Sequence, residues 1–446
     1  MKRQPLRRLV GAGTALLLGM GVAIGSGILR TPGDVASALP SAGWILLVWV
    51  VGGLIVTVQG LVTAELATRY PEAGGEYVFL REAYGEFVAF FFGWAYTVFI
   101  IGGGAAAISL AFGDFACELW SLDPKRAGVM AAIAIVAVTG VNSIGLRAGA
   151  GVQNTLTSVK ILALLAIIAV GLVLGDKPWA STNDSGSGQG AVTASPIGLQ
   201  VLLVGLLPVL WSYNGTTDAV KLAEEVKDVR RALPLAVIGS TVALIVIYAG
   251  VNVALLRVVP APEMGGLTSV PGEAMSRLFG PAGRTGMLIA GMVVCLGSLS
   301  STVLATIRVT FALARDGLTF RILARMSKSQ APVPALWAVA VFSIVLVLNR
   351  NFTKVLDIYF FASAILFGLS YASLIVFRWR DREKRRDVFR CPFGIVLAAF
   401  LILFQGALAW DIARHNTGDV IYTLGLLGGL AIFYLVWKAF PRRRTE

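Results

Sequence analysis

The chain has 446 residues, of which 57% are hydrophobic and 14% are charged. Soluble domains hold roughly 45–50% apolar and about 25% charged residues, so a soluble fold is excluded, as are disordered and collagen-like chains. The formal net charge of +13 does not indicate a nucleic-acid partner. The Lys and Arg residues lie between apolar runs, where they set the orientation of membrane helices. The composition predicts an integral membrane protein embedded in the lipid bilayer.

The expected fold class is an all-α membrane protein with 12 transmembrane helices. Apolar runs of about 20 residues cross the bilayer as helices, whereas a barrel would show alternating segments of about ten residues. The first run has a basic start like that of a signal peptide, but no cleavage site follows, so we assign it as a retained span. The expected spans are 9–38, 43–68, 84–112, 127–145, 151–174, 197–222, 233–257, 285–307, 333–350, 354–377, 393–413 and 419–440.

Basic residues concentrate in alternate loops. The densest run, Arg378–Arg386, and the terminal Arg442–Arg444 fall on the same side as the N-terminus. Both termini are therefore predicted to be cytoplasmic, in an integral plasma (inner) membrane protein. On the other side, Asp176–Ser195 is expected to be a flexible loop, and Pro260–Gly283 to be either a lid over the outer mouth or a plain loop. No soluble domain is expected, so residues 1–446 form a single transmembrane domain.

Two spans are interrupted near their middle by residues that disfavour a helix. Residues 24–28 read Ile-Gly-Ser-Gly-Ile, and residues 211–218 read Trp-Ser-Tyr-Asn-Gly-Thr-Thr-Asp. Glycine costs a helix about 1 kcal/mol relative to alanine, and Asn and Asp compete for backbone hydrogen bonds. Non-helical backbone at membrane depth is tolerated only where protein buries it or it lines a cavity. The alternative is that the glycines only allow close contact between helices.

The interruptions fall in the first and sixth spans. This pattern is typical of two five-helix halves in inverted repeat, with the substrate held where the broken helices meet. We therefore expect a first repeat over residues 1–174, a second over 197–377, and two final helices over 393–440.

The broken helix ends predict the chemistry of the ligand. The helix that resumes near Ile28 presents unpaired N–H groups and a positive dipole end, which suit a carboxylate. The helices that end near Ala23 and Trp211 present unpaired carbonyl groups, which suit an ammonium group. A carboxylate and an ammonium side by side are the backbone of a free amino acid.

Several short motifs recur in an order and spacing that resemble a known family. They are Gly25-Ser26-Gly27-Ile28, Arg69-Tyr70-Pro71-Glu72-Ala73-Gly74-Gly75-Glu76-Tyr77, Asn142-Ser143-Ile144-Gly145-Leu146-Arg147-Ala148-Gly149 with Gln153-Asn154 and Lys160, Glu224-Glu225-Val226-Lys227 with Leu233-Pro234, and Arg308 with Ala314-Arg315-Asp316-Gly317-Leu318. Over nearly its whole length the chain resembles a permease of the amino acid–polyamine–organocation superfamily, closest to the L-type amino-acid transporter branch.

The resemblance implies a substrate site at the two interruptions. The substrate carboxylate would contact backbone N–H groups and the hydroxyl around Ser26 and Gly27, and the ammonium would contact carbonyls of Ala23, Trp211 and Asn214. Residues 213–217 would shape the side-chain pocket. The implied substrate-binding residues are Ala23, Ile24, Gly25, Ser26, Gly27, Ile28, Trp211, Tyr213, Asn214, Gly215, Thr216 and Thr217. The L-type branch usually has an aromatic residue after the glycine at 215, and Thr216 departs from that pattern.

Lys160 lies in the middle of the fifth span, where an ammonium group needs a partner or a lowered pKa. In some permeases similar to this chain, a lysine here takes the place that sodium occupies in sodium-coupled relatives. Lys160 would then brace the first span against Ser300 and Ser301 of the eighth span. Loading and release of a proton is the alternative role, and snorkelling towards the membrane surface is a third.

Other charged residues have a plain structural interpretation beside a functional one. Glu65 and Arg69 are four residues apart and are expected to pair. Asp218 is expected to cap the resumed helix, with a role in gating as the alternative. Residues at the predicted inner ends of spans form either a gate network or a solvated interface; they are Glu224, Glu225, Arg308 and Arg315.

No cofactor, metal site or partner subunit is expected, and the chain is not expected to be an enzyme. Cys117, Cys295 and Cys391 are far apart in the sequence and His415 is the single histidine, so no metal-ligand spacing or Ser-His-Asp triad is present. The predicted function is secondary transport of neutral amino acids by alternating access, through sodium-independent exchange or facilitated transport. The alternatives are a proton-coupled amino-acid symporter and a membrane sensor that does not transport.

Overall fold

The computed structural model describes residues 8, 10–39, 41–72, 74–144, 149–177, 199–327, 331–349, 352–381 and 388–439. Within these ranges the regular structure is helical, and the β-type pairing is limited to one bridge between Val10 and Val226. Most of the predicted outer loop Asp176–Ser195 lies outside the described residues, as does the motif stretch 145–148.

The helices have the following order along the chain. They are α1 (Ala12–Ala23), α2 (Ser26–Ala38), α3 (Ala42–Arg69), α4 (Glu76–Tyr84), α5 (Glu86–Ala95), the π-helix η1 (Tyr96–Gly102), α6 (Gly103–Leu119), the 3₁₀ helix η2 (Pro124–Arg126), α7 (Ala127–Ile144), α8 (Gly149–Leu174), α9 (Leu199–Tyr213), the 3₁₀ helix η4 (Thr216–Glu225), α10 (Val229–Leu256), α11 (Ala261–Met264), α12 (Val270–Arg315), the 3₁₀ helix η5 (Arg321–Ala324), α13 (Val333–Asn349), α14 (Phe352–Arg380), α15 (Gly394–His415) and α16 (Thr417–Ala439).

The all-helical membrane architecture is confirmed. In the described part of the chain, nine helices are long and apolar enough to cross a membrane, and the bent pair α1 and α2 makes a tenth candidate. Two shorter apolar helices, Leu202–Tyr213 and Val333–Asn349, lie where the sixth and ninth spans are predicted.

Two predicted span boundaries need correction. The eighth span, predicted over 285–307, belongs to α12, which begins at Val270 and contains a kink at Gly280, where φ is 67°. Much of the segment predicted as a lid or plain loop is therefore helical. The third span continues to Leu119 because α5, η1 and α6 form one uninterrupted helical segment.

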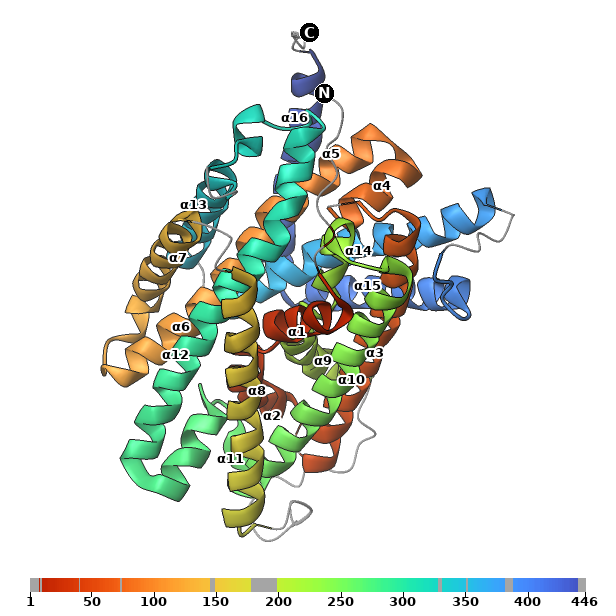
Figure 1. Ribbon diagram of the computed structural model, residues 1–446. Helices are drawn as coiled ribbons and strands as arrows, with labels where there is room; N and C mark the ends of the chain where they lie inside the picture. Colours follow the sequence, from red (N-terminus) through yellow and green to blue (C-terminus); the bar gives the residue numbers. More distant parts are fainter. Residues whose placement is uncertain are drawn as a thin grey trace.

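The broken helices lie in the middle of the bundle (Figure 1). There α1 packs against α8 and α10, α2 packs against α9, and α12 packs against α6. At the edges of the bundle α13 pairs with α7, and α15 pairs with α14. Backbone of the first and sixth predicted spans is thereby surrounded by other helices rather than by lipid, as irregular backbone at membrane depth requires.

Glycine makes the two breaks possible. Gly25 separates α1 from α2 with φ −145° and ψ −145°, and the two helices differ in direction by 47°. Gly215 separates α9 from η4 with φ 100°, a conformation that side chains disfavour. A Cβ atom at Gly215 would lie 2.3 Å from Cγ1 of Val22 in α1. The absence of a side chain at Gly215 therefore brings the two breaks into contact.

Candidate functional site

A cavity lies between the two breaks and the helices around them. Its lining from the breaks consists of Val22, Ala23, Gly25, Ser26, Gly27, Leu210, Trp211, Tyr213, Asn214, Gly215, Thr216, Thr217, Asp218 and Lys221. The structure thus brings most of the predicted substrate-binding residues to one cavity. Ile24 and Ile28 differ from the prediction, because they are 1% and 0% exposed and do not line the cavity. Their side chains belong to the apolar core.

The start of α2 supplies the expected donor groups. The first N–H groups of a helix have no partner within the helix, and α2 begins at Ser26 beside the cavity. The Ser26 hydroxyl accepts a hydrogen bond from the Trp211 indole at 3.3 Å, which ties α2 to α9. These groups can receive a carboxylate.

The two glycines beside Ser26 also serve close helix contact. A Cβ atom on Gly27 would lie 2.5 Å from Cα of Ser212, and one on Gly25 would lie 2.9 Å from Oγ of Ser298. Close contact between helices therefore requires glycine at both positions, as the alternative interpretation of these glycines states. Both glycines also line the cavity. A larger residue at Gly27 would displace α9, so it would not test substrate binding alone.

The carbonyl groups at the breaks are linked by a tyrosine from α10. The Tyr248 hydroxyl lies 3.1 Å from the carbonyl oxygens of both Ala23 and Ser212. Helix α9 ends at Tyr213 rather than near Trp211, and the Trp211 carbonyl accepts from the N–H of Asn214 at 3.1 Å. The Trp211 carbonyl therefore has a protein partner.

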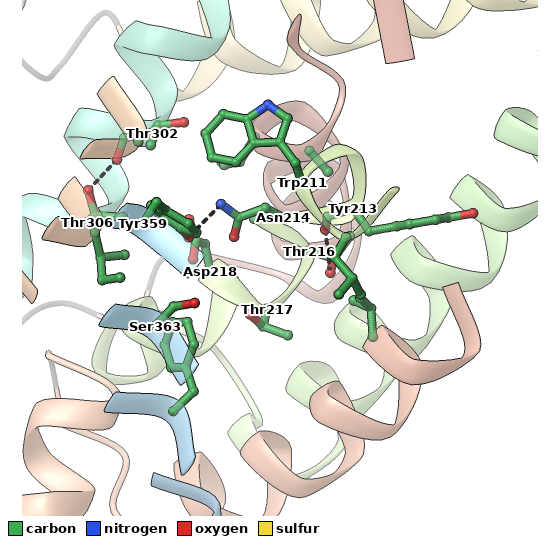
Figure 2. A pocket seen from close by; sticks show the side chains of 18 of the residues that line it. Trp211, Tyr213, Asn214, Thr216, Thr217, Asp218, Thr302, Thr306, Tyr359 and Ser363 are labelled. Atoms are coloured by element: carbon green, nitrogen blue, oxygen red, sulfur yellow. Dashed lines mark hydrogen bonds between the residues drawn. The ribbon is translucent and has the colours of Figure 1, made fainter. Parts of the chain in front are cut away.

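Tyr213 is in the cavity lining, but its ring points away from the other lining residues labelled in Figure 2. Its side chain is fully buried and turned towards α3, where its hydroxyl donates to the Trp49 carbonyl at 3.0 Å. The Thr216 hydroxyl donates to the Tyr213 carbonyl at 3.2 Å. Both residues thus hold the break in shape.

Sequence reasoning missed the opposite wall of the cavity. Asn214 donates from Nδ2 to the Tyr359 hydroxyl at 2.7 Å, and Tyr359 comes from α14 (Figure 2). Helices α12 and α14 also contribute Thr302, Thr306, Phe360 and Ser363. The sequence does show polar residues inside these apolar spans, and they were the available signal for a cavity wall. An apolar span does not show, however, which of its faces points into the bundle.

Lys160 contacts a different serine from the predicted pair. Its ammonium group donates to the Gly21 carbonyl at 3.1 Å and to the Ser298 hydroxyl at 2.8 Å. Ser300 instead donates to Asn142 at 2.8 Å, and Ser301 donates to the Gly297 carbonyl at 2.6 Å. The residues predicted on α12 are thus wrong. The contact partners of Lys160 nevertheless come from α1 and α12.

Three residues of the charged types Asp, Glu and Lys line the cavity beside η4. They are Glu76 of α4, and Asp218 and Lys221 of η4, all buried. The predicted cap at Asp218 is wrong, because Gly215 is the N-cap residue of η4 and no side chain caps it. Asp218 forms an ion pair with Lys221.

Several ion pairs join helices that are distant in the sequence. Glu65 accepts from Arg69 at 2.9 Å, as predicted, and also from Arg378 at 2.6 Å. Arg308 pairs with Glu225 at 2.8 Å, which joins α12 to η4. Elsewhere Arg30 pairs with Asp114 at 3.0 Å and covers the Phe352 ring at 4.1 Å, joining α2, α6 and α14.

The three cysteines are buried and free. Within the described ranges, no group of three or more His, Cys, Asp or Glu residues is placed to hold a metal ion.

Comparison with known proteins identifies the family. A family model described as amino acid permease matches residues 11–432. The b(0,+)-type amino acid transporter 1 of Homo sapiens is 28% identical over 439 residues, covering 97% of this chain and 89% of the relative. The serine/threonine exchanger SteT of Bacillus subtilis is 29% identical over 441 residues, covering 96% and 97%. The large neutral amino acids transporter small subunit 2 of Homo sapiens is 26% identical over 441 residues, covering 94% and 81%.

Proposed function

Since the chain belongs to the amino acid permease family, we propose that it carries neutral amino acids across the plasma (inner) membrane by alternating access. Transport proceeds by sodium-independent exchange or facilitated transport. The proposal depends mainly on one observation: the breaks at Gly25 and Gly215 lie close together and line the same cavity. The N-terminal end of α2 and the C-terminal ends of α1 and α9, which have opposite dipole polarity, therefore lie beside one another at this cavity.

The substrate backbone would bind at those helix ends. Its carboxylate would accept from N–H groups at the start of α2 and from the Ser26 hydroxyl, and its ammonium would contact carbonyl groups at the ends of α1 and α9. Its side chain would face Asn214, Tyr359 and Thr302. The wall that these three residues form offers amide and hydroxyl groups, which suit an uncharged side chain.

The proposed architecture explains how the site would alternate. Twelve spans would comprise two inverted repeats, 1–174 and 197–377, and a final pair over 393–440. The broken spans would then occupy equivalent places in the two halves. The last pair would support the second half, consistent with the packing of α15 on α14.

Sodium independence is supported by the place of Lys160. Its ammonium group binds the Gly21 carbonyl and the Ser298 hydroxyl. A sodium ion there would compete for the same oxygen atoms and would be repelled by a like charge in a site of low dielectric.

Counterflow in liposomes tests the proposal. Purified protein would be reconstituted with unlabelled L-threonine or L-leucine inside, and entry of the labelled amino acid would be measured in sodium and in choline. We expect saturable counterflow that is equal in the two salts. Steep, saturable activation by sodium would contradict the sodium-independent mechanism, and binding without any counterflow would indicate a sensor.

A matched pair of serine variants in α2 tests the site itself. Ser26→Ala removes a hydroxyl that faces the cavity, and we expect the KM for exchange to rise roughly fivefold, the loss of about 1 kcal/mol. Ser37, near the other end of α2, has a hydroxyl that donates to the Gly33 carbonyl and accepts from the Gly266 N–H. Ser37→Ala removes this hydroxyl and should leave KM unchanged. Equal KM values for the two variants would place the substrate elsewhere.

A further inference from the structure

The substrate site does not account for the ionisable residues beside η4. We call Glu76, Asp218 and Lys221 the Glu76 cluster. All three line the cavity, and they are 2%, 6% and 2% exposed. Burial of charge is costly unless each charge is paired.

Two glycines bring Glu76 to this position. Gly74 and Gly75 have φ of 120° and 52°, a region that other residues rarely adopt. A Cβ atom on Gly75 would lie 2.9 Å from Cγ of Lys221. The glycine pair therefore lets the start of α4 approach η4, so that the first residue of α4 enters the cavity wall.

The cluster has an excess of negative charge. The single ammonium group, on Lys221, pairs with Asp218 and lies 5.2 Å from the centre of the Tyr96 ring. The Oε2 atom of Glu76 is inaccessible to solvent and has no hydrogen-bond partner in the described part of the chain, and the same holds for the Tyr96 hydroxyl. A solvated cation or an amine could not reach this oxygen unless the surrounding side chains moved. A proton is small enough to bind to this oxygen.

We propose that Glu76 is the proton-binding site that couples net amino-acid uptake to a proton gradient. The inference rests on the proposed transport function and adds a coupling ion to it. A proton on Glu76 removes the excess charge while the Asp218–Lys221 pair stays ionised. Each step only adds a proton from water to the carboxylate or returns it to water, so no redox partner is involved.

The groups around Glu76 agree with this assignment. Asp218 and Lys221 face it from η4, Tyr96 from η1, and Tyr359 and Tyr371 from α14. On the other elements packed against α4, nearby carboxylates are paired: Asp316, which follows the last residue of α12, pairs with Arg81, and Glu65 of α3 pairs with Arg69 and Arg378. Glu86 of α5 is exposed. Burial raises the pKa of the Glu76 carboxyl, and the Lys221 ammonium opposes that shift.

Coupling follows from the cost of an unpaired charge in a closed cavity. Closing the cavity around a zwitterionic substrate removes water and makes the carboxylate of Glu76 more costly. Closure is therefore favoured after a proton has bound. When the cavity opens to the other side, water returns and the proton can leave with the substrate.

The test compares Glu76→Gln with Glu86→Gln in liposomes. Glutamine resembles the protonated acid, whereas Glu86 lies on the exposed side of α5. With the membrane potential held at zero, one proton per substrate and a gradient of one pH unit support about tenfold accumulation of L-threonine. Wild-type protein and Glu86→Gln should reach it. Glu76→Gln should exchange L-threonine but accumulate none.

A second measurement does not depend on transport. Difference infrared spectroscopy of the purified protein, recorded between acid and neutral pH, detects every carboxyl group that binds a proton. A buried carboxyl group without a hydrogen-bond partner gives a component at the high-frequency edge of that band, and this component should be absent from Glu76→Gln and present in Glu86→Gln. Unchanged accumulation in Glu76→Gln, or persistence of that high-frequency component in it, would overturn the assignment to Glu76. Wild-type exchange without accumulation would overturn the coupling and leave the proposed exchange intact, whereas loss of all wild-type flux would overturn the proposed function.

Discussion

The hydrogen bond between Asn214 and Tyr359 joins the sixth span to α14 across the cavity. Its length is 2.7 Å, and both residues line the cavity. Tyr359 also contacts the Trp211 ring at 5.4 Å in an edge-on arrangement. The orientation of the Asn214 amide, which faces the expected place of the substrate, therefore depends on a residue from a distant part of the sequence.

Removing that hydroxyl should weaken substrate binding. Tyr359→Phe leaves the ring and its contact with Trp211 but takes away the acceptor for Asn214. Loss of a hydrogen bond worth about 1 kcal/mol predicts that KM for L-threonine exchange rises roughly fivefold. Tyr422→Phe, at a partly exposed tyrosine of α16 that does not line the cavity, serves as the control. If both variants keep the wild-type KM, the amide does not contact the substrate.

At the scale of elements, the sequence predicted the breaks better than their partners. The break residues carry their own local signal, because Gly25 and Gly215 disfavour a continuous helix wherever it packs. The contacts of Lys160 depended on how α12 is rotated, and an almost uniformly apolar span does not reveal that rotation. The prediction therefore chose Ser300 and Ser301, whereas Ser298 faces the lysine.

Helix α4 escaped prediction for a different reason. It is nine residues long and lies between predicted spans, so nothing in its hydropathy indicated that it reaches the cavity. The same limit applies to Tyr359, which sits in an uninterrupted span. Residues from distant segments meet in the cavity through tertiary packing, and a single sequence does not encode that packing in any local pattern.

The contact between α4 and η4 can be tested with two glycines. Gly75 and Gly85 flank α4, and both have positive φ, at 52° and 87°. A Cβ atom at Gly75 would press on Lys221 at 2.9 Å, whereas one at Gly85 would meet nothing within 4 Å. Backbone strain of about 1–3 kcal/mol is expected in both alanine variants, but only Gly75→Ala also displaces η4.

The expected result is a difference between the two variants in transport. Both should lower the thermal unfolding temperature, and Gly75→Ala should in addition reduce the exchange rate several-fold, because it displaces η4, which begins directly after the break at Gly215. Fluorescence-monitored unfolding and L-threonine counterflow provide the two measurements. Equal exchange rates in Gly75→Ala and Gly85→Ala would show that close approach of α4 to η4 is unimportant for transport.

At the scale of the whole molecule, the two ends of the bundle differ in basic residues. The end that carries α4 has Arg69, Arg81, Arg378 and Arg380 close together in ion pairs and helix caps. The end that carries α11 lies opposite in Figure 1. Since Lys and Arg are retained on the cytoplasmic side of a membrane, α4 should face the cytoplasm and α11 the outside.

Two acidic residues offer a matched test of this orientation. Each is a partly exposed partner of an arginine. Glu82 of α4 pairs with Arg81, and its side chain is 38% exposed. Glu263 of α11 pairs with Arg277, and its side chain is 53% exposed. The native cysteines are buried, so they should contribute little background labelling. In intact cells a membrane-impermeant maleimide should label Glu263→Cys at once and Glu82→Cys only after the membrane is permeabilised. The reverse order would place the basic end outside, against the charge distribution, and would invert the proposed topology together with both termini.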